Sequence, residues 1–302
     1  MPGWLLTTLA AALLQTWRTA LQQRLRDRFS VGTAGLVRYL YAVPVGVALL
    51  TAYVAIWGGT LPVPGWRFVL GCAAAGLAQV IGTSLLIMAF GYRSFAVGTA
   101  YAKTDAVQAA LLGAVLLHES LSVGAWAGIA IGVAGVQTLS LAGQRGMTWR
   151  ALLQASAQPA ALCGVGAGAG FALTGVAIKW AVQTTTAPDP ILAALCALVL
   201  TNTLQTLMQG GWMAWREPAG LRMAFTGWRS AMWVGVLSGL GSAGWFTAFA
   251  QAPVALVRTV GQVDMVFTLL FSRFYLREQV RPLDALGLVL VVAGVITVLL
   301  FH

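Results

Sequence analysis

Residues 124–142, GAWAGIAIGVAGVQTLSLA, decide the fold class, because this run carries no charged side chain and is as long as a bilayer-crossing helix of about 20 residues. Residues 283–301, LDALGLVLVVAGVITVLLF, repeat its Gly and Ala-Gly-Val pattern with a single acid. Working outward from these two runs, we count ten apolar windows that predict spanning helices: 4–22, 33–57, 67–90, 95–117, 124–142, 160–182, 190–213, 228–250, 253–275 and 283–301.

The composition agrees with an integral membrane protein. Of 302 residues, 59% are hydrophobic and 9% are charged, whereas soluble domains carry about 25% charged residues. This balance excludes a soluble globule and a disordered chain. The net charge of +10 comes from arginines scattered through short loops, so we expect anionic membrane lipids as partners and no nucleic acid.

The chain repeats itself at an offset of 159 residues. Asp105 pairs with Asp264, Glu119 with Glu278, and Gly128 with Gly287. Acids are scarce in this sequence, so matching acids weigh more than matching glycines. Each repeat, 1–143 and 144–302, holds five windows, and an odd number inverts the second repeat. We therefore predict an all-α integral membrane protein of ten transmembrane helices in two inverted five-helix repeats, a design that supports alternating access.

The stretch AVLLHESLS, residues 114–122, runs into Gly128 and Gly135, and with the ten-window repeat it resembles the EamA family of the drug/metabolite transporter superfamily. The family pattern is an apolar run, Gly-Glu, a small polar turn and a Gly-containing helix. Here His118 replaces the Gly and Glu119 keeps the acid; the second copy, YLREQ at 275–279, has Arg277 in the Gly position. The resemblance covers essentially the whole chain and implies a metabolite transporter without fixing its substrate.

The arginines predict the orientation. Alternate connections and helix ends on one side carry Arg24, Arg26, Arg28, Arg93, Arg145, Arg150, Arg216, Arg222, Arg229, Arg273, Arg277 and Arg281, and the other side carries only Arg67. The positive-inside rule then puts both termini outside the cytoplasm, in a multi-pass protein of the cell (inner) membrane. The resemblance implies the opposite, because family members are commonly drawn with cytoplasmic termini. We prefer the arginine distribution.

Polar and aromatic residues inside the windows are the candidate substrate-binding residues, because ionisable groups in a membrane are costly unless they face protein or water. They are Arg18, Arg38, Tyr39, Tyr101, Lys103, Asp105, Gln108, Lys179, Trp180, Arg258, Gln262 and Asp264. Five cations against two acids would make a cavity electropositive and suited to an anion or a zwitterion. Trp17 and Trp245 are further candidates for cavity lining.

Structural roles for the same residues stay open. Arg18, Arg38 and Lys179 lie towards helix ends and could reach the membrane interface. Lys103, Asp105, Arg258 and Asp264 lie deeper and could form ion pairs that fix packing. Since Asp105 and Asp264 are equivalent in the two repeats, a pair with a basic residue across the pseudo-twofold axis is a specific form of this alternative.

The sequence therefore predicts a secondary active transporter of a small organic anion or a zwitterionic metabolite such as an amino acid. No nucleotide-binding GxxxxGK[ST] motif is present, so we expect no direct use of ATP. His118 and His302 lie far apart and the three cysteines show no CxxC spacing, so we expect no enzyme, cofactor or metal. The alternatives are an amphipathic or lipid-linked substrate, and a structural subunit without transport; either a monomer or a homodimer is compatible.

Overall fold

The computed structural model describes residues 2–25, 28–91, 101–142, 159–185, 187, 189–267, 270 and 282–301. Within these ranges the backbone forms helices and turns and no strand. The chain packs as two units, and each unit takes residues from both sequence repeats. Unit 1 comprises Met1–Val80 and Leu173–Ala252, and unit 2 comprises Ile81–Ala172 and Pro253–His302.

Unit 1 is built mainly from long helices that pack along one another. Its helices are α1 (Gly3–Leu25), α2 (Val31–Leu40), α3 (Ala42–Trp57), most of α4 (Trp66–Gly91), the end of α9 (Pro159–Gln183), α10 (Pro190–Arg216), α11 (Pro218–Thr226) and α12 (Trp228–Gln251). Helix α1 packs along α12, while α10 contacts α2, α3 and α12. Asp189 caps α10 by accepting a hydrogen bond from the Ile191 amide at 2.9 Å, and Pro190 fits the first helical turn.

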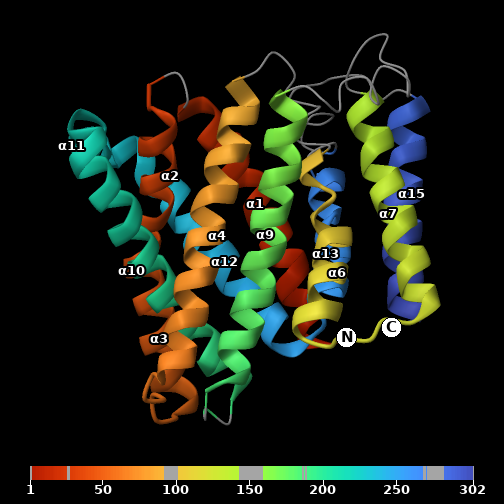
Figure 1. Ribbon diagram of the computed structural model, residues 1–302, viewed down its shortest axis with the longest axis horizontal. Helices are drawn as coiled ribbons and strands as arrows, with labels where there is room; N and C mark the ends of the chain where they lie inside the picture. The colour runs from red at the N-terminus through yellow and green to blue at the C-terminus, as the bar shows by residue number, and fades with distance from the viewer. Residues whose placement is uncertain are drawn as a thin grey trace. The chain divides into compact units, whose positions relative to one another are not determined.

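Unit 2 contains α6 (Asp105–Leu116), α7 (Val123–Ala142), α13 (Val254–Gly261) and α15 (Pro282–Leu300), together with the remaining parts of α4 and α9. Helices α7 and α15, the equivalent last helices of the two repeats, run side by side (Figure 1). A Cβ atom on Gly135 would lie 2.9 Å from the carbonyl oxygen of Gly287, and the reverse distance is also 2.9 Å. Glycine therefore lets these two backbones touch, which is how helices associate tightly in lipid.

Three predicted windows are not continuous helices. Window 33–57 divides at Tyr41 into α2 and α3. In window 95–117, residues 95–100 lie outside the described residues and the chain turns at 103–104 before α6 begins. In window 253–275, α13 ends at Gly261, a turn follows at Gln262, and helix resumes at 263–267. The prediction misses these breaks because hydropathy averages over a whole window.

A fourth difference concerns the segment 214–227, which the hydropathy pattern predicts as a connection. It holds the end of α10 and the separate helix α11. Four helical segments of the described chain are long and apolar enough to cross a membrane: Val31–Trp57, Trp66–Ala89, Pro159–Gln183 and Pro190–Arg216. Turns shorten the fourth and ninth windows, so the count of ten spanning helices stays a prediction.

The backbone conformation at His118 explains why the family pattern has glycine at this position. Its φ angle is +54°, in the left-handed region that favours glycine. The residue follows the end of α6, where the Glu119 amide donates to the Gly113 carbonyl at 3.1 Å. Helices commonly end with a residue in this left-handed conformation just after the C-cap, and that residue is usually glycine.

Candidate functional site

Two helix breaks occupy equivalent positions in the two repeats. The turn at Lys103 and Thr104 precedes α6, and the turn at Gln262 follows α13; 103 and 262 are related by the 159-residue offset. The breaks also meet within unit 2, because the Gln262 side-chain amide donates to the Lys103 carbonyl at 3.5 Å. Backbone groups at a break lose their regular helical partners, so they are available to side chains or to a substrate.

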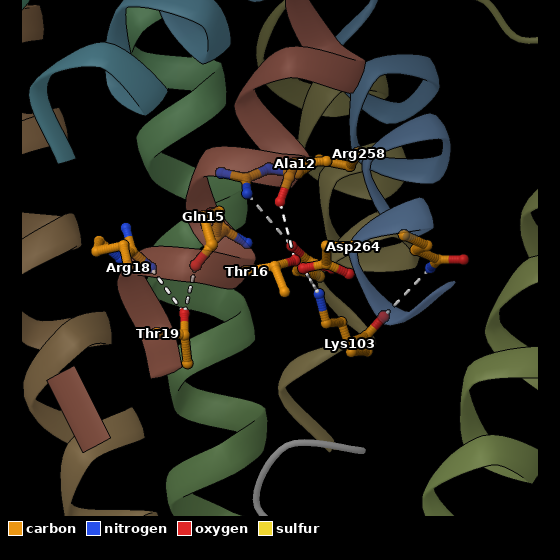
Figure 2. Close-up of polar contacts among 10 residues, drawn as sticks. Ala12, Gln15, Thr16, Arg18, Thr19, Lys103, Arg258 and Asp264 are labelled. Atoms are coloured by element: carbon orange, nitrogen blue, oxygen red, sulfur yellow. Dashed lines mark hydrogen bonds and ion pairs between the residues drawn. The ribbon is translucent and has the colours of Figure 1, made fainter. Parts of the chain in front are cut away.

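Ion pairs cross from one repeat to the other beside these breaks. The Lys103 ammonium of the first repeat donates to the Asp264 carboxylate of the second repeat (Figure 2). Arg258 of the second repeat lies 3.4 Å from the carboxylate of Asp105 in the first, and its guanidinium also donates to the Phe171 carbonyl. All four side chains are at most 16% exposed. The predicted alternative of ion pairs across the pseudo-twofold axis therefore describes their contacts.

Glu119 connects the family motif to this arrangement. Its carboxylate accepts a hydrogen bond at 3.2 Å from the amide of Val254, the first residue of α13. An acid at a helix N-terminus satisfies a free N–H group and opposes the positive end of the helix dipole. The equivalent Glu278 lies outside the described residues. Glu119 thus holds the far end of the helix that carries Arg258.

Tyr101 and Gln108 flank the first break. Gln108 donates to the Thr104 hydroxyl at 2.8 Å and to the Val165 carbonyl at 3.4 Å. Tyr101 is partly buried against Ala160 and Ala161. Unit 2 therefore brings together seven of the twelve candidate residues on α6, on α13 and in the turns beside them: Tyr101, Lys103, Asp105, Gln108, Arg258, Gln262 and Asp264.

The other five candidates belong to unit 1. Arg18 on α1 is 7% exposed and contacts the Thr19 hydroxyl at 3.4 Å (Figure 2). Arg38 on α2 is 4% exposed, with its guanidinium carbon 5.5 Å from the ring centre of Tyr39. The buried Tyr39 hydroxyl donates to the Gln79 carbonyl at 3.2 Å. Both arginines are buried within the protein, and the alternative that they reach the membrane interface stays open.

Lys179 and Trp180 lie near the end of α9. The Lys179 ammonium donates to the Ala252 carbonyl, which ends α12, at 2.8 Å. Trp180 is half-buried, and its ring would lie 3.0 Å from a Cβ on Gly71. Of the two further tryptophans, Trp245 is buried and stacks on Phe249. Trp17 is 60% exposed, and its role as a cavity-lining residue stays a prediction.

A set of buried amides lies outside the predicted site. Gln205 on α10 donates to the Gln79 side chain at 2.7 Å, and Gln209 donates to the Gly32 carbonyl at 2.8 Å. Asn202 on the same helix is also buried. The spacing of 205 and 209, one helical turn apart in an apolar window, is a readable signal. A prediction that rests on the cost of ionisable groups misses it, because an amide carries no charge.

Among the described residues, no group of three or more His, Cys, Asp or Glu side chains is placed to hold a metal ion. Unit 2 holds two cations and two acids in pairs. The described acids of unit 1, Asp189 and Glu217, lie at the ends of α10, while three of its cations, Arg18, Arg38 and Lys179, lie within helices.

Comparison with known proteins identifies the architecture. A family model described as "EamA-like transporter family" matches residues 2–141 and again 158–300. No curated protein matches the chain. A solved structure described only as "Crystal structure of protein" has a TM-score of 0.71 and 19% sequence identity, and the match covers 99% of this chain and 97% of that one. At this identity the likeness shows a shared fold.

Proposed function

Because the chain belongs to the EamA-like transporter family and is a multi-pass membrane transporter, we propose that it moves a small organic anion or a zwitterionic metabolite, such as an amino acid, by alternating access. The observation that carries this proposal is the meeting of two helix breaks at equivalent repeat positions, Lys103 and Gln262. Interrupted helices at corresponding positions of inverted repeats are a strong indication of a substrate site near the midplane.

The four charges beside the breaks favour a zwitterion. Lys103 with Asp264, and Arg258 with Asp105, form a set with no net charge. A zwitterion can exchange partners with such a pair: its carboxylate takes the place of Asp264 at Lys103, and its ammonium takes the released Asp264. Both states stay neutral, so the exchange avoids the large cost of an uncompensated charge in a low-dielectric interior.

The charges of unit 1 favour an anionic group on the substrate. Arg18 and Arg38 are buried within helices, and Lys179 is half-buried. The described acids of unit 1 lie only at helix ends, so no described acid within its helices offsets these cations. The interior of the helices of unit 1 is therefore electropositive. Arginine holds carboxylate or phosphate through two parallel hydrogen bonds, whereas lysine acts as a point charge.

Ligand-induced thermal stabilisation tests the substrate class. The purified protein is heated in detergent with amino acids, with small carboxylates and with organic cations, each at millimolar concentration. We expect amino acids or carboxylates to raise the unfolding temperature, because a ligand that binds only the folded state stabilises it. Stabilisation by organic cations alone would overturn the proposed substrate class. Uptake of the best ligand into proteoliposomes then separates transport from binding.

Substitutions test whether the ligand binds at the helix break. We expect K103Q to weaken both stabilisation and uptake of the best ligand at least tenfold, since Lys103 would lose its charge at the break. Arg67→Gln is the matched control, because Arg67 is an exposed cation at the start of α4. Equal losses in both variants would contradict a role for the break. Normal membrane insertion without uptake of any ligand by the wild type would favour the structural-subunit alternative.

The proposed orientation has both termini outside the cytoplasm of a cell (inner) membrane. Of the arginines that support it, Arg28, Arg216, Arg222 and Arg229 are described and exposed, while Arg26, Arg93, Arg145, Arg150, Arg273, Arg277 and Arg281 lie outside the described residues. A reporter that is active only in the cytoplasm, fused after His302, should be silent. Activity of that fusion would reverse the orientation.

A further inference from the structure

We propose that α11 and the adjoining ends of α10 and α12 bind the headgroup of an anionic phospholipid at the membrane surface. This α11 surface comprises Trp215, Arg216, Arg222, Phe225, Trp228 and Arg229, all exposed. It lies wholly within unit 1, and it is independent of the transport proposed above.

Helix α11 is fixed to a spanning segment, not left as a loose connection. The Thr33 hydroxyl of α2 donates to the Gly220 carbonyl at 3.1 Å, and the Tyr41 hydroxyl donates to the Ala224 carbonyl at 2.7 Å. Gly220 and Ala224 are one turn apart and buried, so a single face of α11 packs on α2. Figure 1 shows α11 continuing from the end of α10 at this position.

The remaining faces of α11 carry one cation and large apolar side chains. Arg222 is exposed, Met223 is 42% exposed and Phe225 is 56% exposed. A short helix with one packed face, an arginine and exposed aromatic or aliphatic side chains is typical of segments that lie in the plane of the membrane interface. The position of α11 directly after a spanning helix places it at that depth.

Each of two arginines next to α11 lies over the ring of a neighbouring tryptophan. The Arg216 guanidinium lies 4.1 Å from the ring centre of Trp215, and the Arg229 guanidinium lies 5.5 Å from that of Trp228. A guanidinium over an aromatic ring keeps N–H groups that can donate to the oxygens of a phosphate. The exposed tryptophan rings suit the boundary between headgroup and acyl chain.

Charge and the surrounding apolar area together select a lipid. Glu217 is the acid in the segment 212–233. Its carboxylate oxygens face Gly32 and Gly220: a Cβ atom added to Gly32 would lie 2.7 Å from one oxygen, and a Cβ atom added to Gly220 would lie 2.5 Å from the other. It is directed towards α2 and does not neutralise the outward arginines. A free phosphate would use the arginines alone, whereas a phospholipid also covers Phe225 and the tryptophans; the surface therefore fits an anionic lipid.

The test compares two fluorescent lipids on the purified full chain in detergent. Phosphatidylglycerol and phosphatidylcholine carry the same dye on one acyl tail, and binding is followed by fluorescence anisotropy. We expect the wild type to prefer phosphatidylglycerol, and the preference to fall as salt rises, because exposed charges are screened. The variant R216Q/R222Q/R229Q should lose the preference at least tenfold, since each arginine near an anionic surface contributes about fivefold.

The matched control is Arg67→Gln, which removes an exposed arginine that also lies over a tryptophan, 5.4 Å from the ring centre of Trp66, at the start of α4. It should leave the preference unchanged. Arg222 belongs to neither arginine–tryptophan pair, and R222Q alone should lower the preference for phosphatidylglycerol about fivefold. This single variant replaces the triple variant as the test if the triple variant fails to fold. An unchanged preference in R222Q, an equal loss in R67Q, or displacement of the lipid by millimolar glycerol phosphate would overturn the proposal.

Discussion

Lys103 and Asp264 belong to different sequence repeats, yet the ammonium of one donates directly to the carboxylate of the other inside unit 2. The equivalent acid, Asp105, makes the same kind of contact with Arg258. The two acids sit at matching positions, but the two cations do not: the 159-residue offset relates Lys103 to Gln262. The acids of the two ion pairs are therefore at equivalent positions in the two repeats, whereas the cations that pair with them are not.

The Lys103–Asp264 pair should show strong coupling in unfolding experiments. D264N alone leaves a buried ammonium without its carboxylate, and we expect it to lower the free energy of unfolding by about 3–5 kcal/mol. The exchange K103D/D264K should recover much of that loss. Unfolding in detergent by heat or by sodium dodecyl sulfate measures both. If the exchange variant is less stable than D264N, the pair does not act as a unit. D189A, at the N-cap of α10, is a control expected to cost about 1 kcal/mol.

His118→Gly should stabilise the protein. The left-handed backbone at φ +54° costs a non-glycine residue about 1 kcal/mol, so we expect a gain of about 0.5–1 kcal/mol in the free energy of unfolding. H118V should cost more than the wild-type residue, because a β-branched side chain is worst suited to this region. Leu116→Gly, at the end of α6 but inside the helix, should instead destabilise by about 1 kcal/mol. A loss of stability in H118G would contradict the backbone argument.

Alanine at Gly135 should separate α7 from α15. Its Cβ would lie 2.5 Å from the Val291 amide nitrogen and 2.9 Å from the Gly287 carbonyl, and backbone atoms of a packed helix cannot move aside locally. We expect a loss of about 1–3 kcal/mol. Gly211→Ala on α10 is the matched control: no atom lies within 4 Å of its Cβ position, so helix propensity alone should make it neutral or stabilising. Thermal unfolding of both variants decides; equal behaviour would refute the close approach.

Glu119→Ala should destabilise α13 by removing the acceptor for the Val254 amide. We expect a loss of about 1–2 kcal/mol, and a smaller one for E119Q, because the amide keeps an acceptor oxygen but not the charge that opposes the helix dipole. Hydrogen exchange at residues 254–257 provides a local readout, which should quicken more in E119A than in E119Q. The same rate in all three proteins would show that the cap does not hold this end.

Much of the site is accessible from the sequence because membrane burial makes each charge costly. Asp105, Asp264 and Glu119 stand out as acids repeated at a fixed offset in a chain with few acids, and pairing across the repeats is one of the two roles that the sequence leaves open. The helix breaks are not predictable in the same way. Tyr41 and Gln262 sit within windows whose average hydropathy is that of a continuous helix, and an average over a window does not register a single turn.

Hydropathy, the internal repeat and the family motif are enough to predict the class of this protein, an all-helical membrane transporter of two repeats, and to single out the few residues that carry charge into the membrane. Three features are visible only in the folded protein: which cation meets which acid, the capping of α13 by Glu119, and the helix within 214–227. The difference lies in the sequence separation of the residues that interact. Hydropathy, helix length and charge cost are properties of neighbouring residues along the chain, whereas an ion pair between 103 and 264 exists only after both repeats have folded into one unit.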